Sequence, residues 1–207
     1  MRKALSLDSE VVRETTAKYL GNECPLGSQK SRYDGFGFER EFWQRGADLG
    51  WTSFLVSEEH GGGSVGGNGL ADLSLIAYEF GRTGAPGPLI ASNLVAAALD
   101  DAQGDHQCRV LEGILNGTEI AAFCVEEGPQ ASVFQSALSI RQDRDDLILC
   151  GVKRPVEAAA QADHLLVTGC SEFGLSQVLA PQGAPGLTVK PMDSVDLTRR
   201  FRLRGVQ

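Results

Sequence analysis

Apolar residues recur at helical spacing in the first part of the chain and at shorter, strand-like spacing after about residue 119. Before that point the pattern predicts five helices, bounded by capping residues, glycine or proline. Their expected ranges are 8–20, 39–49, 70–82, 89–99 and 106–115. Asp8 or Ser9 is expected to cap the first helix, and the glycine- and serine-rich stretch that follows it is expected to be a loop.

After residue 119, short runs of residues that favour strands alternate with turn residues. These runs are 120–125, 137–140, 147–150, 165–168, 177–180 and 187–189. Their spacing is typical of an antiparallel barrel or sandwich. The fold class predicted is therefore α+β, with an all-α domain over residues 1–118 followed by a small antiparallel β-barrel or sandwich domain over residues 119–207.

Composition argues against two classes of binding partner. The formal net charge of −8 argues against nucleic acid and anionic membrane surfaces, both of which favour basic patches. No window approaches the roughly 18 apolar residues of a membrane span, and no secretory apolar region follows the N-terminus. We therefore expect neither nucleic acid nor membrane as a partner.

The cysteines indicate a reducing compartment. All five are widely spaced, and none forms a C-x-x-C pair, which disfavours a zinc site or a disulfide framework. Cys124 and Cys150 lie in apolar runs and are expected to be buried thiols. The sequence thus predicts a cytoplasmic protein without a bound metal.

Two features could suggest other chemistry. The glycine-rich stretch 61–69 could cradle a phosphate, but it lacks a Walker lysine and a strand–GxGxxG–helix order, so a tight interhelical turn is favoured. The histidines His60, His106 and His164 show no metal or triad spacing and are expected at the surface or as capping residues. The carboxylates of Glu58 and Glu59 are expected to lie beside the turn.

An ordered series of motifs resembles the acyl-CoA dehydrogenase family. Residues 42–51 and 55–62 resemble its helix, "LGW" and "PEEYGG" pattern, and residues 78–88 resemble "EELGR…APGP". Residues 111–123 resemble the "L..I..G..IAAFA" stretch that leads into the β domain of these enzymes. The pattern around Lys153 and in residues 196–200 resembles a sub-branch of the family, and the resemblance covers nearly all of the chain after residue 38.

The resemblance implies FAD as cofactor, an acyl-CoA thioester as substrate and a third, C-terminal four-helix bundle that would lie beyond Gln207, so the β domain is expected to be incomplete. In the family the bundle supplies the catalytic carboxylate, flavin N5 takes the β-hydride, and electron-transfer flavoprotein is an indirect partner. No catalytic base is therefore expected among residues 1–207.

Two flavin-motif segments can be placed residue by residue. The family's "Y-x-V-T-E-P-x-x-G-S" falls on residues 123–132, and its "K-x-W-I-T" falls on residues 153–157. The implied cofactor-binding positions are Phe123, Val125, Glu126, Ala131, Ser132, Pro155 and Glu157. Glu126 replaces the threonine that bonds the flavin ring, Ala131 replaces a glycine, and Pro155 and Glu157 replace the tryptophan and the second threonine. A carboxylate facing the ring would disfavour the anionic reduced flavin.

The implied substrate-side residues are Glu79 and Ser132. The helix that carries Glu79 borders the acyl cavity in the family, although a solvated helix face is an equal alternative for this residue.

Two functions remain open. The chain is either part of, or a subunit of, an acyl-CoA dehydrogenase, in a homo- or hetero-oligomer like those thought to act on steroid side-chain CoA thioesters. Alternatively, it is a non-catalytic binding or scaffolding protein that has kept the two front domains.

Overall fold

The computed structural model describes residues 6–25, 37–102, 104–128, 135–192 and 200–205. The chain forms two compact units, Met1–Glu119 and Ile120–Gln207. The first unit is helical and the second is built from strands, which confirms the α+β class.

The helical unit contains every helix that the apolar spacing predicts. Its elements are α1 (Leu7–Glu23), α3 (Arg40–Asp48), the short 3-10 helix η1 (Glu58–His60), α4 (Gly69–Thr83), α5 (Leu89–Asp100) and α6 (Asp105–Leu115). The expected cap at Asp8 or Ser9 is wrong. Ser6 caps α1 by accepting the backbone N–H of Ser9 at 3.0 Å, because the Ser9 hydroxyl is itself buried and directed to a partner on α4.

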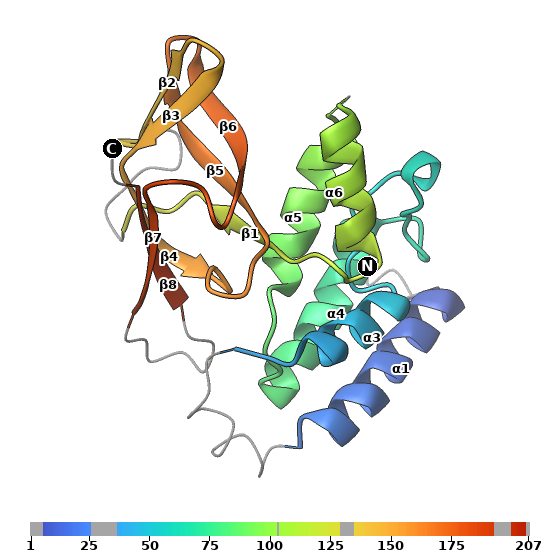
Figure 1. Ribbon diagram of the computed structural model, residues 1–207. Coiled ribbons are helices and arrows are strands. Elements are labelled where there is room, and N and C mark those ends of the chain that lie inside the picture. The colour runs from blue at the N-terminus through green and yellow to red at the C-terminus, as the bar shows by residue number, and fades with distance from the viewer. Residues whose placement is uncertain (1–5, 26–36, 103, 129–134, 193–199, 206–207) are drawn as a thin grey trace. The chain divides into compact units, whose positions relative to one another are not determined.

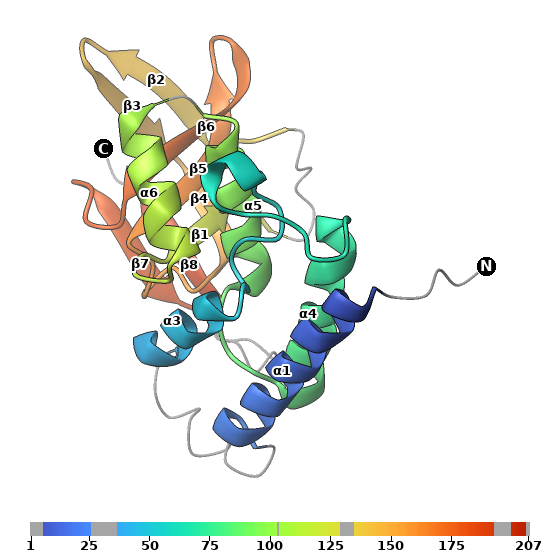
Figure 2. The ribbon, with the colours of Figure 1, turned by 90° about the vertical axis from the view of Figure 1, so that its right-hand side faces the viewer.

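The core of the helical unit is an aromatic cluster around Trp51. The Trp51 ring is fully buried and lies 4.7 Å from that of Phe80 on α4, centroid to centroid, in an edge-on geometry. Its Nε1 donates to Oγ1 of Thr16 on α1 at 3.0 Å, so its polar edge is satisfied. Gly46 of α3 lies against this ring, and a methyl group there would overlap it. Figure 2 shows α1 running beside α4, the two helices that supply Thr16 and Phe80 to this cluster.

The described residues of the β unit form two sheets (Figure 1). The first has the order β1-β5-β2-β3, with β6 also paired to β5, and the second has the order β4-β8-β7. The strands are β1 (Ala121–Cys124), β2 (Ser139–Asp143), β3 (Asp146–Cys150), β4 (Val152–Glu157), β5 (His164–Ser171), β6 (Gly174–Pro181), β7 (Leu187–Pro191) and β8 (Arg200–Gly205). The first sheet is mixed, because β5 pairs in parallel with both β1 and β2, whereas only antiparallel pairing was expected.

Six of these strands coincide with the predicted runs, whereas β4 and β8 were not predicted as strands. Half of the residues of β4, Val-Lys-Arg-Pro-Val-Glu, are charged, and the strand contains a proline, which cannot donate a hydrogen bond to a neighbouring strand. Pairing with β8 forms the strand, with an irregular register between Lys153 and Val156. The tertiary pairing therefore overrides a weak local preference.

Burial of the cysteines matches the expectation only in part. Cys124 is buried, whereas Cys150 is half-exposed on β3 and therefore does not belong to the core. No helix among the described residues is both long and apolar enough to cross a membrane. Within the same residues, no group of three potential metal ligands comes together.

Candidate functional site

The two flavin-motif segments lie side by side in the β unit. The first segment leaves β1 and continues through Gly128, and the second is β4. The backbone N–H of Arg154 donates to the carbonyl oxygen of Glu126 at 2.7 Å, and Glu127 and Arg154 form a parallel β-bridge. Segments that are almost 30 positions apart in the sequence thus form one backbone platform.

A buried ion pair holds this platform together. Lys153 of β4 is 1% exposed, and its Nζ lies 2.7 Å from Oε1 of Glu127. The same ammonium group donates to the Ser136 hydroxyl at 2.9 Å and to the carbonyl oxygen of Val125 at 3.1 Å. All three of its N–H groups can therefore be used, as burial of a cation requires.

Glu127 links the platform to the segment that precedes β2. Its carboxylate accepts the backbone N–H groups of Ala137 at 2.7 Å and Leu138 at 3.1 Å, together with the Ser136 hydroxyl. Burial alone would raise the pKa of Glu127. The hydrogen bonds from Lys153, Ser136 and the two amides outweigh it and lower the pKa to about 2. Glu127 is therefore an ionised, structural carboxylate.

The implied cofactor positions differ in exposure. Phe123, Val125, Pro155 and Glu157 are half-buried along the platform, whereas Glu126 is exposed. Ala131 and Ser132 lie outside the described residues. The platform thus presents one exposed carboxylate at the position where the family has a threonine.

Arg154 adds a positive charge to the platform. The Arg154 side chain is exposed, and a Cβ at Gly128 would lie 3.5 Å from its Nε. Gly128 has a φ of 121°, a backbone conformation that favours glycine. The guanidinium group therefore covers the turn that follows Glu127.

Glu79, the implied substrate-side residue, is a buried carboxylate. It is 2% exposed on α4, so the alternative of a solvated helix face is wrong. Its Oε2 accepts Nε of Arg82 at 2.7 Å, and its Oε1 lies 3.4 Å from Nη1 of Arg13 on α1. Two cations therefore compensate the buried charge, which joins α1 to α4.

The glycine-rich loop binds a carboxylate of its own chain. Oδ2 of Asp72 accepts the Ser64 hydroxyl at 2.6 Å and the Gly66 backbone N–H at 2.9 Å, while Oδ1 accepts the Ser9 hydroxyl at 2.7 Å. Burial would raise the pKa of Asp72, but these hydrogen bonds outweigh it and lower the pKa below its usual value. The loop is an interhelical turn between η1 and α4, as expected, because an internal anion occupies its donors.

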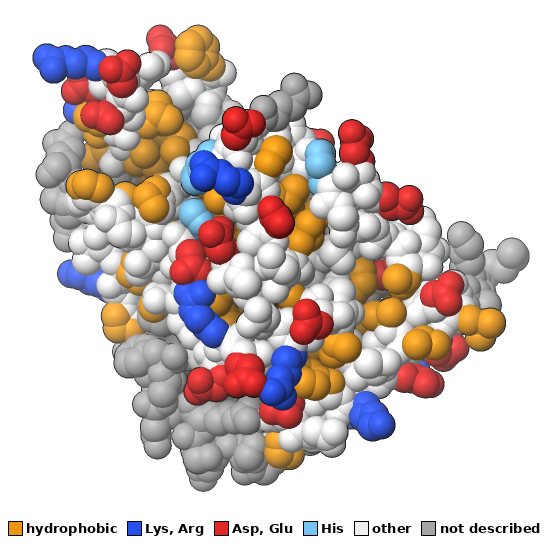
Figure 3. Space-filling view, turned by 45° about the vertical axis from the view of Figure 1, so that its right-hand side comes forward, with side chains coloured by type: hydrophobic (Ala, Val, Ile, Leu, Met, Phe, Trp, Pro, Cys, Tyr) orange, Lys and Arg blue, Asp and Glu red, His pale blue; other side chains and the backbone are white. Residues whose placement is uncertain are grey.

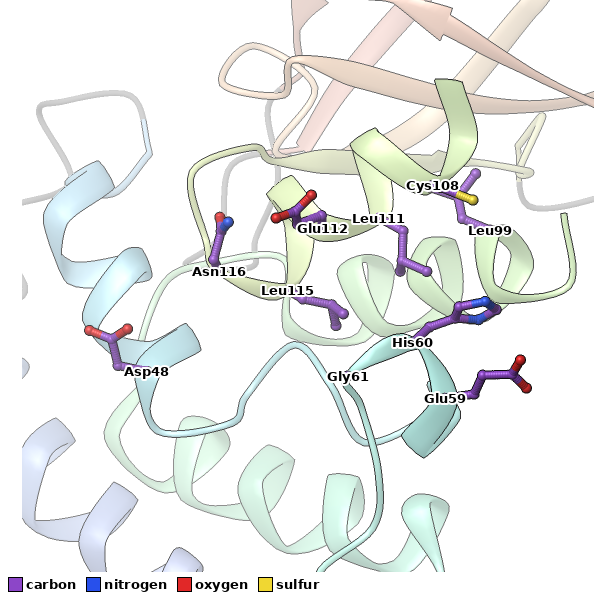
Figure 4. Close-up of a pocket in the computed structure, with 10 residues that line it drawn as sticks. All are labelled: Asp48, Glu59, His60, Gly61, Leu99, Cys108, Leu111, Glu112, Leu115 and Asn116. Carbon is purple, nitrogen blue, oxygen red and sulfur yellow. The ribbon is translucent and has the colours of Figure 1, made fainter. Parts of the chain in front are cut away.

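A histidine–aspartate contact was not predicted. Nδ1 of His60 lies 2.7 Å from Oδ1 of Asp100, at the end of α5, and Ser57 donates its hydroxyl to the same oxygen at 2.9 Å. The exposure expected for His60 is confirmed. Forty residues separate the pair in sequence, so no local spacing could have indicated it. Of these residues, His60 lines a pocket of the helical unit (Figure 4).

Comparison with known proteins places the chain in a family. The pattern of the acyl-CoA dehydrogenase N-terminal domain matches residues 6–118, more than half of the sequence. The chain therefore belongs to the acyl-CoA dehydrogenase family. A comparison with curated proteins finds no match.

Solved structures show the same fold. A variant of the Tcur3481-Tcur3483 steroid ACAD aligns with a TM-score of 0.84 and 21% identity, over 96% of this chain and 54% of that chain. The ChsE4-ChsE5 complex from Mycobacterium tuberculosis aligns at 0.81 and 18% identity, over 99% and 55%. A glutaryl-CoA dehydrogenase from Mycobacterium smegmatis in complex with FADH2 aligns at 0.77 and 16% identity, over 98% and 53%. The chain thus spans little more than half the length of these relatives.

Proposed function

We propose that the chain acts as part or a subunit of an FAD-dependent acyl-CoA dehydrogenase that desaturates an acyl-CoA thioester in lipid or steroid side-chain catabolism. The observation that carries this proposal is the backbone bond from Arg154 to Glu126, which joins the two flavin-motif segments into one platform. Family membership and the shared fold support it independently.

The platform fits FAD through its backbone and its half-buried apolar side chains. Phe123, Val125 and Pro155 would line the flavin, with Glu126 and Glu157 at its edge. Ala131 and Ser132 remain proposed cofactor-binding positions by their place in the motif alone. FAD, when bound, supplies the acceptor for the hydride that leaves the β-carbon. This chain would position the flavin, while the exposed Glu126 carboxylate would oppose negative charge on the reduced ring.

We assign no general base to residues 1–207. Hydrogen bonds lower the pKa values of Asp72 and Glu127, and the Glu79 carboxylate accepts a hydrogen bond from Arg82. Each of these carboxylates links elements of the fold. Glu79 and Ser132 remain our proposed substrate-side residues. The carboxylate that removes the α-proton would come from additional sequence or from a sister subunit.

The proposed setting is a cytoplasmic homo- or hetero-oligomer. Relatives of the same fold are described as complexes, among them ChsE4-ChsE5. A sister subunit with intact flavin motifs would complement the Glu126 and Pro155 substitutions of this chain. Electron-transfer flavoprotein would then receive electrons from the assembled enzyme.

Native mass spectrometry of the protein isolated from its own organism tests this function. A species whose mass includes FAD, in a longer chain or with a dehydrogenase-like subunit, is the expected result. A 207-residue species with neither FAD nor such a partner would contradict it. Steady oxidation of an acyl-CoA by the isolated chain, with an electron acceptor, would contradict the assignment of the base to another segment.

A non-catalytic binding or scaffolding role is the second candidate. The specific observation in its favour is the exposed Glu126 at the flavin-contacting position. Under this alternative the chain would keep the helical and β domains without any redox role. A 207-residue species with neither FAD nor a dehydrogenase-like partner would therefore favour the second candidate over the first.

A further inference from the structure

The pocket beside His60 has an apolar floor. It encloses about 660 Å³ in the helical unit and is lined by Asp48, Glu59, His60, Gly61, Leu99, Cys108, Leu111, Glu112, Leu115 and Asn116. Figure 4 shows Leu111 and Leu115 reaching from α6 toward Gly61, with Leu99 of α5 beside Cys108. A volume of this size accommodates several side chains or a small ligand.

The charges that line the pocket are of one sign. The carboxylates of Asp48 and Glu59 lie at opposite ends, and Glu112 lies between them (Figure 4). All three side chains are exposed, and none of them has a hydrogen bond or ion pair with another described residue. No lysine or arginine is among the lining residues.

The two polar lining residues other than the carboxylates, His60 and Asn116, have partners of their own. His60 is held through Nδ1 by the Asp100 carboxylate, and Asn116 uses its Oδ1 to accept Thr118. The pKa of Asp100 lies below its usual value, because hydrogen bonds from His60 and Ser57 outweigh burial, so Asp100 remains ionised. On the face that Figure 3 presents, hydrophobic side chains lie exposed among acidic and basic ones.

We propose that this acidic pocket, lined by the ten residues named above, is a docking site for a basic amphipathic segment of a partner protein. Aliphatic side chains of that segment would occupy the leucine floor, and its lysine or arginine groups would meet Glu59, Glu112 and Asp48. Because the carboxylates at the two ends are separated by the apolar floor, the occupant must carry more than one positive charge along its length. A peptide segment meets this requirement, and charge complementarity with the acidic rim favours it.

Cys108 offers a direct reporter of occupancy. It is exposed and lines the pocket, whereas Cys170 is also exposed but lies in the other unit. The probe is a short amidated peptide with leucines at helical spacing and lysines between them, added to the full chain. We expect saturating peptide to slow the alkylation of Cys108 at least about fivefold, because only the unbound fraction of the chain would then react at this thiol. The alkylation rate of Cys170 should change little. A counterpart peptide with glutamate in place of lysine should leave both rates unchanged.

Two double variants test whether the peptide binds at this pocket or is attracted by the negative charge of the whole protein. Glu59→Gln combined with Glu112→Gln should weaken protection about three- to tenfold, the range of two exposed charge pairs. Glu14→Gln combined with Glu172→Gln removes the same charge from exposed positions elsewhere and should not weaken it. Failure of the lysine peptide to protect Cys108 at about 1 mM would overturn the proposal. Equal protection by the acidic peptide, or equal effects of the two double variants, would also overturn it.

Discussion

The Lys153 ammonium group lies 2.7 Å from the Glu127 carboxylate, and the side chains are 1% and 11% exposed. This contact ties β4 to the segment that leaves β1, and Glu127 extends it to the amides of Ala137 and Leu138. This buried pair therefore supports the proposed flavin platform in addition to the backbone bond between Arg154 and Glu126, and it can be mutated without changing any implied cofactor position.

Lys153→Met should destabilise the β unit strongly. It leaves the Glu127 carboxylate buried without its cation, and breaking a buried pair in this way costs about 3–5 kcal/mol in unfolding free energy. Arg45→Met is the control, because Arg45 pairs with Glu41 at an exposed position of α3 and should cost no more than about 1 kcal/mol. Urea denaturation followed by circular dichroism measures both. Equal losses in the two variants would contradict the structural role of Lys153.

Glu127 should make stability depend on pH in the acid range. Its pKa is about 2 in the folded chain against an ordinary value of 4.5. A lowered folded-state pKa contributes stability above pH 4.5, and that contribution is lost as the pH falls from 4.5 toward 2. The Glu127→Gln variant should therefore lose a slope of up to about 1.4 kcal/mol per pH unit in that window. Denaturation of both proteins between these pH values tests it, and parallel curves would refute it.

Alanine should have opposite effects at two helical glycines. Gly46→Ala places a methyl group into the Trp51 ring and should destabilise the helical unit by about 1–3 kcal/mol through overpacking. At Gly81 of α4 nothing lies within 4 Å of an added Cβ, so Gly81→Ala should stabilise by about 0.4–1 kcal/mol. Thermal unfolding of the two variants measures the difference, and a stabilising effect at Gly46 would show that the ring is free to move.

Glu126→Thr should strengthen flavin binding. It removes the exposed carboxylate from the platform and restores a hydroxyl group at that position, which should tighten FAD binding about three- to tenfold. Glu172→Thr changes the same residue type at an exposed position in the β5–β6 turn and serves as the control. Flavin fluorescence titration measures both affinities. If Glu126→Thr left the FAD affinity unchanged or weakened it, while Glu172→Thr had no effect, the Glu126 side chain would lie away from the flavin.

The sequence by itself determined most of the elements of the fold. Apolar spacing with glycine and proline at the boundaries predicted the five α-helices that the described residues form, because these signals act within a few residues of one another. Short runs of strand-favouring residues between turn residues predicted six of the strands in the same way. The ordered series of motifs indicated the family. The local pattern did not predict β4, since Lys153, Arg154 and Pro155 give that segment little local preference for a strand.

Tertiary structure decided how distant residues meet. Sequence placed Glu79 equally well at an acyl cavity or on a solvated face, whereas packing of α1 against α4 buries it between Arg13 and Arg82. The contact between His60 and Asp100 spans 40 positions, and that between Glu127 and Lys153 spans 26. Hydrogen bonds and ion pairs act over a few ångströms in space, so residues far apart in sequence form them only when the chain returns to the same place.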